Sequence, residues 1–361
     1  MHKNKYLIFA LLFVFVQGAV LTAEGKDDGK TVTTAAPKEH FTLWNQCEAL
    51  TTLKAYVEDV TNPESSNYIC PEDRIATFDM DGTFIGELYP TYFEYNLLEY
   101  RVLEDSLYKN IAPDDVRQTA QYIRDFVRNG TPLPSHFDMR HARAAAKAYA
   151  GMTIAEFDAY VKAYAATPAN GFTGMTYGES FYKPMLEVMD YLEDNGFTNY
   201  IVSGSDRFIC RSLVEWIGIA PNRVIGMDVC LVANKEGEEA GVDYTMGKDE
   251  YLVRSDSLII KNLKTNKVMQ ISQEIGKVPV LSFGNSSGDQ AMHNYCLSNE
   301  RYRTATFMLV ADDDARDHAD LAEGAKREAI WRENGYTVIS MKNDFKTIYG
   351  DNVAKTDFVF Y

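Results

Sequence analysis

Two aspartates one residue apart follow a short apolar stretch of the chain. Asp79 and Asp81 flank Met80, and Gly82 and Thr83 come next. Carboxylates at this spacing repel each other unless a cation lies between them, and oxygen ligands of this kind suit Mg²⁺. One carboxylate could act as a nucleophile while the other transfers protons. The alternative interpretation is an Asx-type turn at the end of a strand.

A serine and a lysine elsewhere in the chain have the chemistry of phosphate ligands. Ser203 and Gly204 follow an apolar stretch at 200–202, and a hydroxyl with backbone N–H groups at a strand-to-helix junction can hold phosphate. The alternative for this segment is a plain helix N-cap. Lys267 begins a segment of helical periodicity and could neutralise phosphate charge, or simply face solvent. Three other lysines are alternatives by spacing: Lys261, Lys264 and Lys277.

Apolar stretches and helical periodicity alternate along the chain. The predicted strands lie at 75–78, 198–202, 224–227, 278–283, 306–310 and 337–339, and the clearest helices at 43–60, 152–165, 184–195 and 206–217. This alternation predicts the α/β class, with a doubly wound parallel sheet covered by helices on both faces. Such sheets bind ligands at the carboxyl ends of their strands. Asp79, Ser203 and Asn285 each follow a predicted strand, so we expect them to meet at one edge.

The composition restricts both the class of protein and the class of partner. The 361 residues are 46% hydrophobic and 24% charged, as in ordinary globular proteins, and suffice for about two folded units. Acidic residues number 52 and basic residues 36, which gives a net charge of −16. This excess of acid argues against nucleic acid as a partner. The sequence indicates no particular oligomeric state.

The first 23 residues have the pattern of a secretory signal peptide. Lys3 and Lys5 precede an apolar run at 7–16, and small residues follow. The run is shorter than the roughly 20 residues of a membrane-spanning helix, although an uncleaved anchor is the alternative. We expect an exported protein, periplasmic or secreted, with a flexible linker at 24–40 and no stable membrane insertion after cleavage.

The five cysteines leave at least one thiol unpaired, and two of them are candidates for a disulfide bridge in such an exported protein. Cys47 and Cys70 could pair across the short segment between them. The alternative is that all five are small buried apolar residues, the other three being Cys210, Cys230 and Cys296.

Four motifs in order resemble those of the haloacid dehalogenase superfamily. They lie at 78–83, 201–203, Lys267 and 284–289, and the stretch 180–211 resembles the phosphoserine-phosphatase-like branch. The resemblance implies a Rossmann-like core domain formed by 41–83 and 179–361. It also implies a helical cap domain at 84–178, inserted between the first two motifs.

The resemblance implies a role for each motif residue. Asp79 would attack phosphorus and form an aspartyl-phosphate. Asp81 would protonate the leaving alcohol and then deprotonate the hydrolytic water. Ser203 and Gly204 would hold phosphoryl oxygens, and Lys267 would bridge the nucleophile and the phosphate. Mg²⁺ would bind Asp79, the backbone carbonyl of Asp81 and the fourth motif.

The fourth motif departs from the family pattern. The family has an aspartate directly after Gly284, where this chain has Asn285. An amide oxygen can still bind Mg²⁺, but one negative charge is lost. We expect Asp289 to compensate, directly or through water. Gly288 stands where this branch often has an asparagine.

The predicted cap offers candidates for substrate selection. Glu87 could bind a substrate ammonium group, or be a surface carboxylate. Arg140 and Arg143 share a helical face and could bind a substrate carboxylate, or form a solvated basic face. A group of aromatic residues could enclose a quaternary amine such as choline, or form the core of the cap. This group comprises Tyr89, Tyr92, Phe93, Tyr95 and Tyr100.

These inferences predict an exported, Mg²⁺-dependent phosphomonoesterase acting on a small phosphate ester, similar to phosphoserine phosphatase. Phosphocholine and phosphoethanolamine are alternative substrates, and a phosphotransferase is an alternative activity on the same fold. A non-catalytic phosphate- or metal-binding protein is the alternative from another class.

Overall fold

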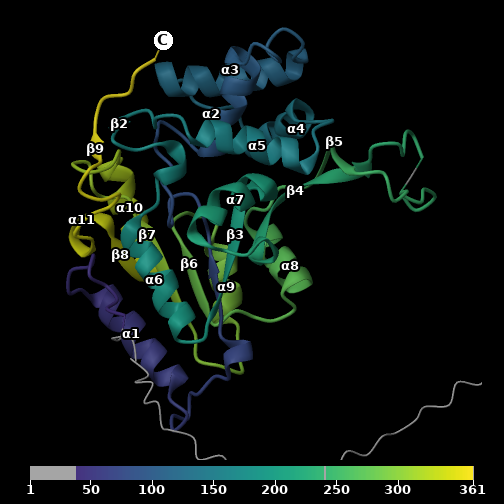
Figure 1. Cartoon of the computed structure of the whole chain (residues 1–361). Coiled ribbons are helices and arrows are strands. Elements are labelled where there is room, and N and C mark those ends of the chain that lie inside the picture. The colour runs from purple at the N-terminus through teal and green to yellow at the C-terminus, as the bar shows by residue number, and fades with distance from the viewer. Residues whose placement is uncertain (1–37, 240, 361) are drawn as a thin grey trace, which may run out of the picture. The chain divides into compact units, whose positions relative to one another are not determined.

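Residues 38–239 and 241–360 are described in a computed structural model of the chain (Figure 1). The predicted signal peptide at 1–23 and nearly all of the predicted linker lie outside these residues. The contacts of the chain group Glu39–Tyr361 into one unit, which holds the fold described below. Among the described residues no helix has both the length and the apolar composition needed to cross a membrane.

A seven-stranded sheet in the order β5-β4-β3-β1-β6-β7-β8 lies at the centre of the fold. All neighbouring pairs are parallel except β4 and β5, which are antiparallel. The predicted doubly wound parallel sheet is therefore confirmed. The strands are β1 (Ile75–Phe78), β3 (Thr198–Asp206), β4 (Val224–Ala233), β5 (Leu252–Ile260), β6 (Leu281–Gly284), β7 (Ala305–Val310) and β8 (Thr337–Ser340).

Helices cover both faces of this sheet. Ile201 belongs to the large apolar core under α1 and α6, whereas the next residue, Val202, packs on the opposite side with Ile271 of α8 and Met292 of α9. This follows from the alternation of side chains along a strand. The helices are α1 (Glu48–Thr61), α2 (Phe93–Glu99), α3 (Asp114–Asn129), α4 (Phe137–Ala148), α5 (Ile154–Ala165), α6 (Lys183–Asp194), α7 (Arg207–Val214), α8 (Thr265–Glu274), α9 (Gln290–Leu297), α10 (Leu321–Glu333) and α11 (Met341–Asp344).

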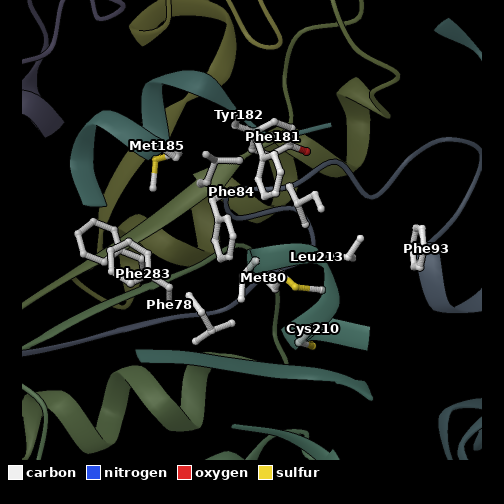
Figure 2. Packing of buried hydrophobic residues seen from close by; sticks show 14 of the residues in the cluster. Phe78, Met80, Phe84, Phe93, Phe181, Tyr182, Met185, Cys210, Leu213 and Phe283 are labelled. Atoms are coloured by element: carbon white, nitrogen blue, oxygen red, sulfur yellow. The ribbon is translucent and has the colours of Figure 1, made fainter. Parts of the chain in front are cut away.

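Strands β1 and β6 end at nearly the same level, and β3 continues past it to Asp206. Phe78 at the end of β1 pairs in register with Ile201 of β3 and Phe283 of β6. The rings of Phe78 and Phe283 stack at 4.4 Å (Figure 2). Phe283 also stacks on Phe307 of β7 at 5.0 Å. Such pairs stabilise a core by about 0.5–1.5 kcal/mol beyond the burial of their area. The segments that follow β1, β3 and β6 therefore leave the sheet from one well-packed edge.

Helices α2 to α5 lie between β1 and α6 in sequence and form a group beyond this edge of the sheet (Figure 1). They occupy the inserted segment predicted as a cap, whose division from the core at 84–178 stays a prediction. Two short strands, β2 (Phe172–Thr173) and β9 (Ala354–Lys355), pair beside it.

A long hairpin of β4 and β5 joins this helical group and was not predicted. The predicted strand at 224–227 continues to Ala233, and β5 returns antiparallel to it. The Arg254 backbone N–H donates to Met152 O, and the Gly151 N–H donates to Arg254 O, each at 2.8 Å. The hairpin is therefore attached to the loop between α4 and α5.

All five cysteines are free, so the predicted bridge between Cys47 and Cys70 is not formed. The Cys47 sulfur instead accepts a hydrogen bond from the Leu50 N–H at the start of α1. The alternative interpretation, that all five are buried, holds for Cys210 and Cys296, whereas Cys47, Cys70 and Cys230 are only partly buried.

Candidate active site

Asp79 is held at the end of β1 by its backbone and by a buried lysine. Its N–H donates to Phe283 O at 2.9 Å, which fixes the residue beside β6. Lys267 Nζ donates to Asp79 Oδ1 at 2.5 Å. Thr83 Oγ1 lies 3.5 Å from the other oxygen, Oδ2. Asp79 therefore has one oxygen in a tight ion pair and one that is weakly engaged and suited to nucleophilic attack.

The charge on Asp79 depends on cations. Burial raises the pKa of Asp79 to about 7, the Asp289 carboxylate adds to the shift, and the Lys267 ammonium opposes it. A further cation near Asp79 would stabilise its ionised form, which is the form that attacks.

Asp81 lies in the same turn, with its side chain almost fully buried. Its Oδ2 accepts a hydrogen bond from Ser205 Oγ at 2.8 Å, while its Oδ1 is buried without a partner. Burial raises the pKa of Asp81 to about 7, against the effect of the Ser205 hydroxyl, and the Glu94 carboxylate raises it further. A carboxyl group that titrates near neutral pH can both give and take a proton.

Ser203 lies deeper than the sequence predicted. Its side chain is 0% exposed, and its Oγ accepts from the Ser205 N–H at 3.1 Å and lies 3.5 Å from Asp81 Oδ2. Gly204 and Ser205 line the cavity instead. The reason is that β3 continues to Asp206 rather than ending at Val202. Ser205 is thus a site residue that sequence reasoning missed, although its position two residues after Ser203 indicates a shared face.

Lys267 is the predicted lysine that reaches the nucleophile. It is buried at the start of α8 and also donates to Asp289 Oδ1 at 2.7 Å. Lys264 is exposed, and Lys277 pairs with Asp73 at 2.6 Å. Lys261 enters the same cavity from another side.

Asp289 is engaged by donors on both carboxylate oxygens. Oδ1 accepts from Lys267, and Oδ2 accepts from the N–H groups of Asn285 at 3.1 Å and Ser286 at 3.0 Å. Burial disfavours the charge of Asp289, but the Lys267 ammonium and the hydrogen bonds from Lys267 and the Ser286 N–H together lower its pKa. Asp289 therefore holds the loop and the lysine in place, while Asn285 lines the cavity.

Gly82 is required by the close approach of two side chains to the turn. Its φ of +76° favours glycine, and a Cβ at this position would lie 1.9 Å from Asn285 Nδ2 and 2.6 Å from Glu87 Oε2. Glu87 lines the cavity beside the Asn285 side chain. Burial raises the pKa of Glu87 to about 7.

The two predicted substrate arginines lie away from the cavity. Arg140 and Arg143 are both exposed on α4. Arg140 donates to Gln118 Oε1 at 3.2 Å and stacks over the Tyr122 ring. Neither arginine lines the cavity that contains Asp79. They form the solvated basic face that was the alternative interpretation.

The aromatic group divides between the cavity and the core. Tyr92 and Tyr95 line the cavity, with their rings 5.3 Å apart. Tyr89 and Phe93 are buried and pack against Tyr177. Tyr100 lines a different hollow.

The cavity at this site has a volume of about 80 Å³ and an acidic wall. Lys261 donates to Glu94 Oε1 at 2.7 Å, which neutralises one of the acids. The wall holds six carboxylates and two lysines: Asp79, Asp81, Glu87, Glu94, Asp138, Asp289, Lys261 and Lys267. Sequence reasoning missed Glu94 and Asp138, which come from α2 and α4.

The donor atoms of this wall fit a divalent cation. In the described part of the chain no three His, Cys, Asp or Glu side chains form a group that could hold a metal ion. The expected donors are of another kind: the Asp79 carboxylate, the Asp81 backbone carbonyl and the Asn285 amide. The wall has more carboxylates than lysines, and Asp81 Oδ1 has no hydrogen-bond partner. A hard cation would offset the negative charge that these groups carry when ionised.

Comparisons with known proteins find similarity in solved structures. No family model and no curated protein matches the sequence. A conserved protein of unknown function from Anaerococcus prevotii DSM 20548 is 16% identical, with a TM-score of 0.48 over 89% of this chain and 99% of that one. Cytosolic 5'-nucleotidase IIIB bound to cytidine is 12% identical, with a TM-score of 0.47 over 82% of this chain and 85% of that one.

A phosphoserine phosphohydrolase-like protein from Francisella tularensis subsp. tularensis SCHU S4 is 16% identical. Its TM-score is 0.39, over 74% of this chain and 94% of that one. At these values we base the function on the geometry of the site.

Proposed function

We propose that this chain is a phosphomonoesterase of the haloacid dehalogenase type, which transfers the phosphoryl group of a small ester first to Asp79 and then to water. One observation carries the proposal. The buried Lys267 ammonium lies 2.5 Å from Asp79 Oδ1, and Asp81, a carboxyl that can carry a proton near neutral pH, follows in the same turn. The order of the four motifs along the chain supports the same conclusion.

The first step forms an acyl phosphate on Asp79. Asp79 Oδ2 attacks phosphorus, the bond from phosphorus to the ester oxygen breaks, and Asp81 gives its proton to the leaving alkoxide. Lys267 offsets negative charge on the nucleophile and on the phosphoryl group. Gly204 lines the cavity beside the nucleophile, and we assign its backbone to contact with the phosphoryl group.

The second step releases orthophosphate. The ionised Asp81 takes a proton from water, and that water attacks phosphorus while the bond to Asp79 breaks. Asp81 is protonated again and ready for the next ester. A bound Mg²⁺, held by Asp79, the Asp81 carbonyl and Asn285, would supply positive charge that offsets the charge of the phosphate.

The size and charge of the cavity support a small substrate with a cationic group. A volume of about 80 Å³ suits a leaving group of a few heavy atoms better than a nucleoside. Within the described part of the chain, Glu87 and Asp138 form no ion pair with a lysine, unlike Glu94, and only the Arg327 charge acts on Glu87 from farther away. Both acids line the cavity with Tyr92 and Tyr95. We propose an ammonium-bearing ester such as phosphoserine, phosphoethanolamine or phosphocholine. The pattern of residues 1–23 supports export of the enzyme.

Purified protein and its Asp79→Asn variant test the reaction. We expect Mg²⁺-dependent release of phosphate from an aryl phosphate and from at least one small ester. The variant should lose at least about 10³-fold in kcat because it lacks the nucleophile, and should keep its circular dichroism spectrum. No turnover across a broad ester panel with any divalent cation, or a variant as active as the wild type, would overturn the proposal. With added glycerol, the ratio of phosphoglycerol to phosphate separates a phosphotransferase from a hydrolase.

A further inference from the structure

The side chains of Glu87 and Asn285 meet above the catalytic turn. Both are more than nine-tenths buried, and both line the cavity beside Asp79. The Asn285 amide nitrogen and the Glu87 carboxylate both lie against Gly82. A Cβ placed on Gly82 would be 1.9 Å from Asn285 Nδ2 and 2.6 Å from Glu87 Oε2.

Asp289, the residue expected to compensate for the acid missing at position 285, is engaged by other donors. The sequence predicted that Asp289 would compensate for the loss of an acid at Asn285. In the structure the Asp289 carboxylate is 1% exposed, paired with Lys267 through Oδ1 and bound by two backbone N–H groups through Oδ2. Its charge is therefore offset by Lys267, and its oxygens are already engaged.

We propose that Glu87 takes over the acidic function of the fourth motif, so that a divalent cation in this cavity is held by Asp79 together with the Glu87–Asn285 pair. The inference rests on the proposed function, since it assumes a metal-dependent site. In this arrangement Asn285 provides a neutral oxygen, and Glu87 provides the negative charge from a different segment of the chain. The buried, partnerless Asp81 Oδ1 is an independent indication that a ligand belongs at this place.

This assignment differs from the role that the sequence suggested for Glu87. A carboxylate that binds only a substrate ammonium would leave the affinity for metal unchanged when it is neutralised. A carboxylate of the metal site would lower that affinity with no substrate present. Binding of Mg²⁺ alone therefore separates the two roles.

Isothermal titration of the metal-free protein with Mg²⁺, without substrate, tests the proposal. We expect Glu87→Gln to weaken Mg²⁺ binding at least about tenfold, as loss of a charged group near a metal does. The exchange variant Glu87→Gln/Asn285→Asp restores a carboxylate paired with an amide and should recover affinity to within about threefold of wild type. Asn285→Asp alone should bind Mg²⁺ more tightly than wild type.

Asp138→Asn is the matched control. It removes one charge from the same cavity, but the Asp138 carboxylate accepts from Tyr95 Oη at 3.0 Å. We expect it to change Mg²⁺ affinity by less than about threefold. Thermal unfolding without metal checks that each variant is folded.

Three results would overturn the inference. The first is wild-type protein that binds no Mg²⁺, and the second is a Glu87→Gln variant that binds Mg²⁺ as tightly as the wild type or no more weakly than Asp138→Asn does. The third is an exchange variant that binds Mg²⁺ no more tightly than Glu87→Gln. These results are distinct from failure of the proposed function. If affinity depends on Glu87 but no ester is hydrolysed, the function fails and the metal assignment stands. If esters are hydrolysed but Glu87→Gln binds Mg²⁺ normally, the assignment fails and the function stands.

Discussion

Asp81 controls proton transfer in the proposed reaction, and Ser205 adjusts its acidity. Burial raises the pKa of Asp81 to about 7, and the hydrogen bond from Ser205 Oγ at 2.8 Å limits that rise. Asp81 must carry a proton for the first step, so kcat/KM should fall as the pH rises past this pKa.

Ser205→Ala removes a hydrogen bond that stabilises the ionised form of Asp81, which raises its pKa further. We therefore expect the alkaline limb of the kcat/KM profile to move up by roughly half to one pH unit, the equivalent of one hydrogen bond. Ser205→Thr keeps the hydroxyl and should keep the wild-type limb. Steady-state kinetics across the neutral range measure both profiles. An alanine variant whose limb stays in place or moves to lower pH contradicts this role.

Individual site residues were predictable where local sequence marks them. Asp79 and Asp81 stand in one turn after an apolar strand, and Lys267 begins a helix at the spacing of a known motif order. Glu87 and Asn285 meet only because β1 and β6 are neighbours in the sheet. No local pattern indicates a contact between positions so far apart in the chain.

The β4–β5 hairpin contributes a buried ion pair to the joint between the sheet and the helical group. Arg254 of β5 is fully buried and donates to Asp206 Oδ1 at 3.3 Å and Oδ2 at 2.6 Å. Its guanidinium lies 3.9 Å from the centre of the Phe157 ring in α5. Asp206 also caps α7 by accepting the Phe208 N–H at 2.9 Å. One arginine thus connects β5, α5 and the start of α7.

Arg254→Leu should lower the free energy of unfolding by about 3 kcal/mol or more, because it leaves Asp206 buried without its counter-charge. Adding Asp206→Asn should recover part of this loss, since asparagine removes the charge and still caps the helix. Urea denaturation of the wild type, both single variants and the double variant measures the coupling. Additive losses would show that the two residues do not act as a pair.

Elements buried on both faces were predictable, and the half-exposed ones were not. Strands β1, β6, β7 and β8 are short apolar runs, which is the pattern of a strand covered by helices on both sides. The edge strand β5 has four consecutive polar residues, Arg254 to Ser257, between apolar ends and is largely accessible, so its sequence resembles a loop. The hairpin was missed for that reason.

At the scale of the whole molecule, negative charge is concentrated where an anionic substrate must bind. The chain carries −16 overall, and the cavity wall contains more carboxylates than lysines. Burial raises the pKa values of Asp79 and Glu87 to about 7, so these two carboxyl groups of the metal-free site hold protons that a cation would displace.

The stabilisation that Mg²⁺ gives to folding should therefore increase with pH. Below about pH 6 these groups are protonated and protons compete with the cation, whereas above about pH 7.5 the carboxylates are free to bind it. We expect the Mg²⁺-induced rise in the unfolding temperature to be larger at about pH 8 than at about pH 6. Thermal unfolding in EDTA and in Mg²⁺ at both pH values measures the difference. An equal rise at both values would show that these carboxylates do not bind the cation.

The attachment of β5 to the loop between α4 and α5 limits how the cavity can open. The hairpin is a continuation of the sheet, yet it shares two backbone hydrogen bonds of 2.8 Å with Gly151 and Met152. Swinging α4 and α5 outward must either bend this ribbon or break both bonds. The distance that α4 and α5 can swing to admit an ester and release phosphate is thus limited by the stiffness of β5, a strand that does not contact the reacting groups.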